Sequence, residues 1–193
     1  MDVVPGPAVG LRPSRVAEAG GRRATVDGRK VIVRDLRTGR VIELIGHKYS
    51  VTSVHFDGTG KRLVTSSEDG DARIWNAKTG VSQPPLRGHF GIVNDASFSP
   101  DGRWVVTAGP FSGGLWRSNS SSIHAFLRNT DRPIAARFAS DTRIVTRARD
   151  GKVREWVCDY CGTLDDLIRL ARARLARTGR TFTPEERREF LSR

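Results

Sequence analysis

The sequence predicts an all-β protein made of about four similar four-stranded antiparallel sheets, followed by two short C-terminal α-helices. Three observations lead to this prediction. Tryptophan recurs with a period of about 41 residues, at Trp75, Trp116 and Trp156. Gly-His pairs recur at nearly the same spacing, at Gly46-His47 and Gly88-His89. Within each period, short runs of β-branched or alternating residues are separated by turns that contain Gly or Asp.

The second unit shows the pattern most clearly. Residues 50–56 alternate apolar and polar side chains, residues 62–66 form a β-branched run, and residues 72–75 return after a glycine turn. The last expected strand, residues 81–86, contains two prolines, which suit an exposed outer edge because proline has no N–H to donate. Four strands in about 40 residues are the signature of one blade of a β-propeller.

Residues from about 15 to 158 resemble the WD-repeat β-propeller family, because spacing, turns and marker residues agree across four units. The resemblance implies a chain that covers the C-terminal four-blade portion of a larger propeller, or a truncated one, since the fourth unit has no outer strand of its own. It divides the chain into an irregular segment 1–14, blades within 15–160 (about 15–45, 46–87, 88–130 and 131–158) and a tail 161–193.

The resemblance also implies a hydrogen-bonded network inside each blade. In such a network a Trp indole N–H donates to a Thr hydroxyl, and a His connects that hydroxyl to an Asp. The implied members are His47, Thr65, Asp69 and Trp75, then His89, Thr107 and Trp116, then Thr146, Asp150 and Trp156. In the first unit, Arg34 stands at the Trp position.

A catalytic Ser-His-Asp arrangement is the alternative interpretation of these residues. A catalytic triad occurs once in a protein and needs an oxyanion hole, whereas this set recurs with the period of the repeat. We therefore expect a structural role and no enzymatic activity, with no cofactor and no metal.

The tail carries the patterns of two amphipathic helices, over residues 163–178 and 184–192, each with residues that favour a helix start. We expect them to cover the last blade; docking of a partner is the alternative. Cys158 and Cys161 allow a redox pair or half of a zinc site, but we expect two half-buried thiols. A tail of this kind resembles the C-termini of bacterial WD-repeat signalling proteins.

Composition excludes several classes of protein. The 193 residues contain no apolar run of membrane-spanning length and no secretory signal, and two Cys cannot support a disulfide-rich scaffold. These features predict a cytoplasmic protein. The net charge of +12 raises nucleic acid as a partner, yet the basic residues are dispersed in runs of two at most. A nucleic-acid-binding basic propeller is therefore the alternative function.

The sequence favours a non-enzymatic scaffold or sensor that binds other proteins, as a fragment of a larger bacterial signalling protein. Aromatic and charged residues of the inter-strand loops are the candidate anchors for an unidentified protein partner. They are Lys48, Tyr49, Phe90, Phe111 and Arg132. Because the end blades have open edges, we also expect the chain to associate with itself.

Overall fold

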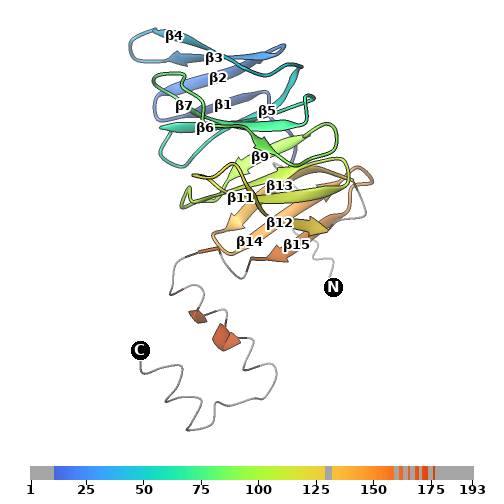
Figure 1. The fold of residues 1–193 in the computed structure, drawn as a ribbon. Coiled ribbons are helices and arrows are strands. Elements are labelled where there is room, and N and C mark those ends of the chain that lie inside the picture. The colour runs from blue at the N-terminus through green and yellow to red at the C-terminus, as the bar shows by residue number, and fades with distance from the viewer. Residues whose placement is uncertain are drawn as a thin grey trace.

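The computed structural model describes residues 11–128, 132–158 and 161–162, and individual residues of the tail at 165, 168–169, 171–173 and 176. Four separate antiparallel sheets contain all its strands, which confirms the predicted all-β class. Each sheet is a meander whose strands pair in chain order. We refer to the sheets as blades 1 to 4 (Figure 1).

The strand bounds follow the period of the sequence. Blade 1 contains β1 (Val16–Ala19), β2 (Arg22–Asp27), β3 (Lys30–Asp35) and β4 (Val41–Ile45). Blade 2 contains β5 (Val51–Phe56), β6 (Arg62–Ser67), β7 (Asp71–Asn76) and β8 (Leu86–Arg87). Blade 3 contains β9 (Asp95–Phe98), β10 (Trp104–Ala108), β11 (Ser112–Arg117) and β12 (Ile123–Arg128). Blade 4 contains β13 (Pro133–Ser140), β14 (Arg143–Ala148) and β15 (Val153–Val157).

The outer strand of blade 2 differs from the expectation, whereas the three described strands of blade 4 agree with the expected lack of an outer strand there. In blade 2 the expected strand 81–86 shrinks to β8 and an isolated bridge between Trp75 and Ser82. Pro84 and Pro85 interrupt it because neither has an N–H for the ladder. Blade 4 has three strands in the described residues, so β15 is paired only on the side of β14.

The blades follow one another in an open arc, with blades 1 and 4 at its two ends (Figure 1). Their first strands, β1, β5, β9 and β13, are neighbours in that order. A separate apolar cluster fills each interface between successive blades. Trp75 packs toward blade 1 and Trp116 toward blade 2, so each of these indoles fills the interface with the preceding blade.

The outer face of blade 1 is polar. Val31 and Val33 of β3 point into the interface with blade 2, whereas Arg34, the residue after Val33, points to the other side and is exposed. Ion pairs cover this face, between Arg23 and Glu18 and from Lys30 to Asp27 and Glu43. The exchange of Trp for Arg at residue 34 therefore suits a face on which the described structure places no further blade.

Residues 11–15, which we call the N-terminal strap, connect the two ends of the arc. The carbonyls of Arg15 and Ser14 accept hydrogen bonds from Val26 in blade 1 and Val54 in blade 2, at 2.9 and 2.8 Å. Further back, the carbonyl of Arg12 accepts from Arg137 of blade 4, at 3.0 Å. The strap thus runs along the inner edges of the blades. Residues 1–10 of the predicted irregular segment lie outside the described residues.

The tail is described in part. Residues 165, 168–169, 171–173 and 176 are helical and fall in the first predicted helix, whereas the second, 184–192, lies outside the described residues. The structure thus supports one short helix. No helix of the described chain is long and apolar enough to span a membrane.

Candidate functional site

The network of blade 2 is complete. Trp75 Nε1 donates to Thr65 Oγ1 at 2.9 Å, and the same hydroxyl lies 2.7 Å from His47 Nε2. His47 Nδ1 lies 2.9 Å from Asp69 Oδ2. Because the hydroxyl already accepts from the indole, its own hydrogen donates to Nε2, and Nδ1–H donates to the carboxylate. The four side chains thus form one directed chain of hydrogen bonds.

Burial sets the charge state of this network. Burial lowers the pKa of His47, against the opposing effect of its hydrogen bond to Asp69. Burial acts to raise the pKa of Asp69, but hydrogen bonds from the Lys48 amide and from His47 outweigh it and the pKa is lowered. A neutral imidazole beside a carboxylate results. With its hydroxyl oxygen occupied by the indole, Thr65 is poorly placed to act as a nucleophile.

Blade 3 retains the histidine, the threonine and the tryptophan. His89 Nε2 lies 2.7 Å from Thr107 Oγ1, which accepts from Trp116 Nε1 at 2.9 Å. Burial lowers the pKa of His89 to about 4. Gly109 is essential here, because a Cβ at that position would lie 2.1 Å from His89 Nδ1. The turn that follows Thr107 therefore leaves room for the imidazole of His89. In blade 2 the corresponding turn supplies Asp69, which bonds to the imidazole.

Blade 4 retains only the last step, in which Trp156 Nε1 donates to Thr146 Oγ1 at 3.0 Å. Asp150, which the sequence placed in the network, instead pairs with Lys152 at 2.8 Å and is exposed. Its carboxylate has no histidine to hold, because no Gly-His pair precedes this blade. The networks thus shorten along the chain from blade 2 to blade 4.

Three of the five candidate partner-binding residues come together between blades 3 and 4. Phe90, Phe111 and Arg132 line a hollow of about 380 Å³, which we call the Phe90 pocket. Its remaining lining residues are Gly91, Ile92, Asn94, Pro110, Ile134 and Arg149. Phe90 is 88% exposed and Phe111 is 64% exposed.

The other two candidates lie elsewhere. Lys48 and Tyr49 belong to the loop before β5 in blade 2 and do not line the Phe90 pocket. The Lys48 amide donates to Asp69, so this residue supports the network of its blade. Tyr49 is 63% exposed. A second hollow, of about 300 Å³, shares Phe90, Pro110 and Phe111 with the Phe90 pocket and continues the apolar surface toward Phe126.

Sequence reasoning missed a second set of repeated residues, the arginines at the start of the second strand of each blade. Arg22 donates to the carbonyl of Gly60 at 3.4 Å, and Arg62 donates to the carbonyl of Gly102 at 2.6 Å. Each guanidinium thus reaches the turn of the following blade. The signal was present, because Arg22, Arg62, Arg103 and Arg143 recur at 40 or 41 residues, as the tryptophans do.

A second missed group lies at the inner edge of blades 2 to 4. Asp95 of β9 is fully buried and accepts from Arg137 of β13 and from the amide of Ala136. Arg137 also lies 2.8 Å from His55 Nε2 of β5. No repeat marks these residues, which is why the sequence pattern did not single them out. They join three blades through one buried carboxylate.

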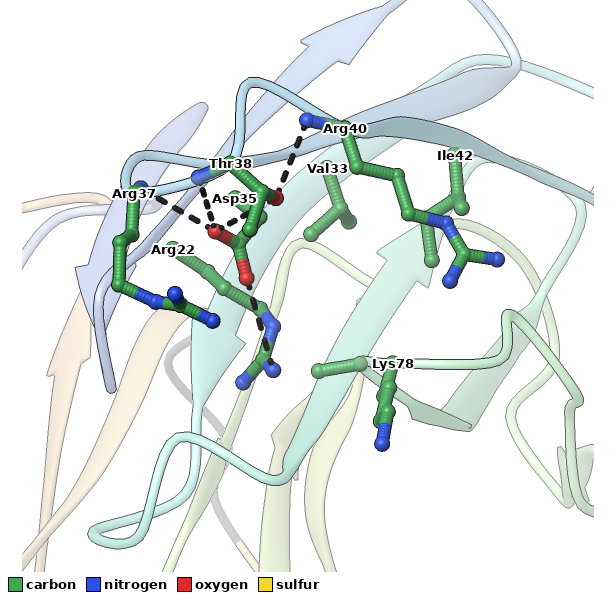
Figure 2. A pocket seen from close by; sticks show the side chains of 9 residues that line it. Arg22, Val33, Asp35, Arg37, Thr38, Arg40, Ile42 and Lys78 are labelled. Carbon is green, nitrogen blue, oxygen red and sulfur yellow. Dashed lines mark hydrogen bonds and ion pairs between the residues drawn. The ribbon is translucent and has the colours of Figure 1, made fainter.

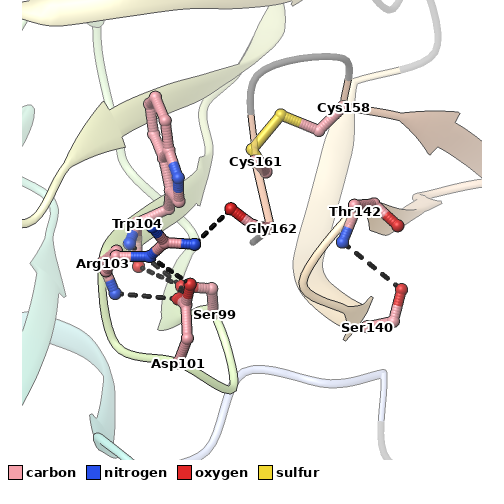
Figure 3. The surroundings of a disulfide bond; sticks show 9 residues. All are labelled: Ser99, Asp101, Arg103, Trp104, Ser140, Thr142, Cys158, Cys161 and Gly162. Carbon is pink, nitrogen blue, oxygen red and sulfur yellow. Dashed lines mark hydrogen bonds and ion pairs between the residues drawn. A yellow bond between two sulfur atoms is a disulfide. The ribbon is translucent and has the colours of Figure 1, made fainter. Parts of the chain in front are cut away.

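The two cysteines differ from the expectation. Cys158 and Cys161 form a disulfide, where two half-buried thiols were predicted (Figure 3). Both sulfurs lie in the apolar cluster of blades 3 and 4, and Arg103 donates to the carbonyl of the adjacent Gly162. A disulfide leaves no thiolate to bind zinc. The described residues contain no group of three or more metal-ligating side chains.

Known proteins resemble parts of this chain. The family model described as "WD domain, G-beta repeat" matches residues 39–76 and 80–114. The nuclear distribution protein PAC1-2 of Uncinocarpus reesii is 42% identical over 91 residues, which cover 42% of this chain and 20% of that protein. The SIR4-interacting protein SIF2 of Saccharomyces cerevisiae is 30% identical over 113 residues, which cover 58% of this chain and 21% of that protein.

The chain spans about a fifth of the length of these two curated relatives. Both relatives are eukaryotic, so they lend no support to the resemblance to bacterial signalling proteins. The crystal structure of the computationally designed Ika4 protein superposes with a TM-score of 0.66 at 22% identity and covers 82% of this chain and 98% of the design. This likeness concerns the fold alone. Residues 39–76 and 80–114 of this chain are thus similar in sequence to the family described as "WD domain, G-beta repeat".

Proposed function

We propose that this chain is a non-enzymatic protein-interaction module that binds an extended acidic segment of a partner protein in the Phe90 pocket. The proposal rests on the exposure of two aromatic residues: Phe90 is 88% exposed and Phe111 is 64% exposed. Burying a phenylalanine side chain is worth about 1.5–3 kcal/mol, so two exposed rings on one hollow offer a partner a strong anchor.

The pocket also indicates the chemistry of the partner. Its lining includes the apolar side chains of Ile92, Pro110 and Ile134 and two cationic side chains, Arg132 and Arg149. None of the nine lining residues is acidic. A large apolar side chain with a neighbouring carboxylate would match both features, because complementary charge favours the correct partner and orientation.

The relatives support a role in binding proteins. One is named for its interaction with SIR4, and others are named nuclear distribution proteins. By analogy, we place this chain among scaffolds that hold other proteins together. Its membership of a bacterial signalling protein stays a prediction from the tail sequence.

Selection of peptides tests the proposal without a known partner. A phage-displayed library of random 12-residue peptides is selected on the wild-type chain. We expect enriched peptides that combine a large apolar residue with Asp or Glu. Phe90→Ala should weaken the binding of an enriched peptide about tenfold or more, as removal of a central anchor does.

The matched control is Val81→Ala, because Val81 is also exposed (67%) but does not line the pocket. It should leave peptide affinity unchanged, and circular dichroism should show both variants folded. Enriched peptides that are basic, or that bind Phe90→Ala as tightly as wild type, contradict the proposal.

A further inference from the structure

A second pocket lies between blades 1 and 2, remote in sequence from the Phe90 pocket. It has a volume of about 280 Å³ and is formed by the turn between β3 and β4 and the loop after β7 (Figure 2). Its lining residues are Arg22, Val33, Asp35, Arg37, Thr38, Arg40, Ile42, Ala77 and Lys78. Four of these nine side chains are cationic and one is acidic.

The single carboxylate is engaged by its own turn. Asp35 Oδ1 accepts from the Thr38 amide at 2.8 Å, the Thr38 hydroxyl at 2.9 Å and the Arg37 amide at 3.1 Å. The hydrogen bond from the Thr38 amide is the largest of the effects that lower the pKa of Asp35. Asp35 is therefore ionised at neutral pH, and one of its oxygens has little capacity left for the cations around it.

The cations are only partly neutralised. Arg22 Nη2 lies 3.9 Å from Asp35 Oδ2, at the limit of an ion pair. Arg37, Arg40 and Lys78 are exposed, and within the described part of the chain no ion pair involves their side chains. One carboxylate against four cations leaves a surplus of three positive charges on the walls of one small hollow.

We propose that this hollow binds a phosphate monoester, carried either by a partner protein or by a small phosphorylated compound. A phosphate dianion carries about two negative charges and three acceptor oxygens, which suit converging guanidinium and ammonium donors. The hollow lies at the lower end of the size range of ligand pockets, so it admits a compact charged group better than a large ring. Val33, Ile42 and Ala77 give the site an apolar back wall.

The site is independent of the proposed function, because the two pockets share no residue and lie on different blades. The net charge of +12 belongs to the whole chain, whereas four cationic side chains line this one hollow. Arg29 provides a comparison, because it is an exposed arginine of the same blade at the hairpin between β2 and β3 and does not line the hollow.

Binding of two probes to the full chain tests the proposal by isothermal titration calorimetry in low salt. The probes are glycerol 3-phosphate and a capped Gly/Ser pentapeptide with one central phosphoserine, with the unphosphorylated pentapeptide as its control. Arg40→Gln and Lys78→Gln should each weaken binding about two- to fivefold, as loss of one exposed ion pair does. Arg29→Gln should leave the affinity unchanged.

A fourth variant should change the affinity in the opposite direction. Asp35→Asn removes the one negative charge while its amide oxygen can still accept from the Thr38 amide, so phosphate affinity should rise. Binding of the phosphopeptide alone would identify a protein-borne phosphate, and binding of glycerol 3-phosphate a small phosphorylated compound. Equal weakening by Arg29→Gln and Arg40→Gln, or no binding of either probe at millimolar concentration, would overturn the proposal. If a 20-base-pair DNA duplex binds the wild type and all variants with the same affinity, its binding reflects only the diffuse positive charge of the chain.

Discussion

At Thr65 one hydroxyl group connects an indole, an imidazole and, through the imidazole, a carboxylate. The threonine is fully buried, so each of its hydrogen bonds replaces contact with water that folding removes. In blades 3 and 4 the hydroxyls of Thr107 and Thr146 likewise accept a hydrogen bond from the indole of their own blade. A threonine is thus the constant centre of the network, while its outer members vary from blade to blade.

Asp69 is the outer member whose removal should be most costly. Its carboxylate accepts from the Lys48 amide, from His47 and from the Asp71 amide. Asp69→Asn keeps the shape but turns an amide NH₂ toward one of these donors. We expect a loss of about 1–3 kcal/mol in the free energy of unfolding, measured by urea denaturation.

Asp150→Asn is the matched control for that experiment. Asp150 sits in the corresponding turn of blade 4, but its side chain is 46% exposed and forms an ion pair with Lys152. Loss of this surface ion pair should lower the free energy of unfolding far less than Asp69→Asn does. Equal effects of the two substitutions would mean that the network of blade 2 adds no stability.

The sequence predicted the recurring network residues, but it missed both the recurring arginines and the group around Asp95, which does not repeat. The resemblance to the WD-repeat family implied His47, Thr65 and Trp75 as network members, and the structure brings them into contact. The same resemblance implied Asp150, yet without a histidine its carboxylate pairs with Lys152. The group around Asp95 occurs once, since it depends on the side chains of three neighbouring inner strands, and a period cannot reveal it.

At the scale of the element, the blade boundaries were predictable because turns at Gly and Asp interrupt a regular strand pattern. The length of the outer strand of blade 2 was not, because an outer strand has a partner on one side only and tolerates prolines. In the tail, the pattern predicted two helices, of which the structure describes residues of the first. The disulfide escaped prediction because sequence separation alone does not fix the distance between two Cβ atoms.

The Cys158–Cys161 disulfide fastens the end of blade 4. It holds Gly162 where its carbonyl accepts from Arg103 of blade 3 (Figure 3). A loop this short predicts a stabilisation of about 2 kcal/mol from chain entropy. Disulfides are rare in the cytoplasm, and in that reducing compartment, which the sequence predicts for this protein, the pair would be reduced.

We therefore expect the Cys158→Ser/Cys161→Ser double variant to melt several degrees below the oxidised wild type in a thermal scan. Wild-type protein in dithiothreitol should melt close to the double variant. If dithiothreitol leaves the melting temperature of the wild type unchanged while the double variant melts lower, the effect comes from the loss of sulfur packing and not from the bond.

At the scale of the whole molecule, the arc has two different ends. Blade 1 ends in a face covered by ion pairs, whereas blade 4 ends in β15, whose outer edge has no strand partner in the described residues. Unpaired strand edges favour pairing with another chain, and charged side chains discourage association. Self-association, expected from the sequence, should therefore use the β15 edge.

Sedimentation velocity over a range of concentrations tests this expectation. Val157 of β15 is 47% exposed, and Val157→Lys should lower the fraction of dimer because a lysine on an edge strand opposes pairing. Val16→Lys introduces the same charge on the outer face of blade 1, where Val16 is 50% exposed, and should leave the dimer fraction unchanged. A wild-type chain that stays monomeric at all concentrations would show the prediction to be wrong.

The N-terminal strap has a consequence for the order in which the chain matures. The bond between Arg12 and Arg137 joins residues 125 positions apart, so it cannot form until the start of blade 4 has left the ribosome. Before then the strap can bind only the inner edges of blades 1 and 2, through Arg15 and Ser14. The contact of the strap with blade 4 therefore forms only after synthesis has passed Arg137, later than its contacts with blades 1 and 2.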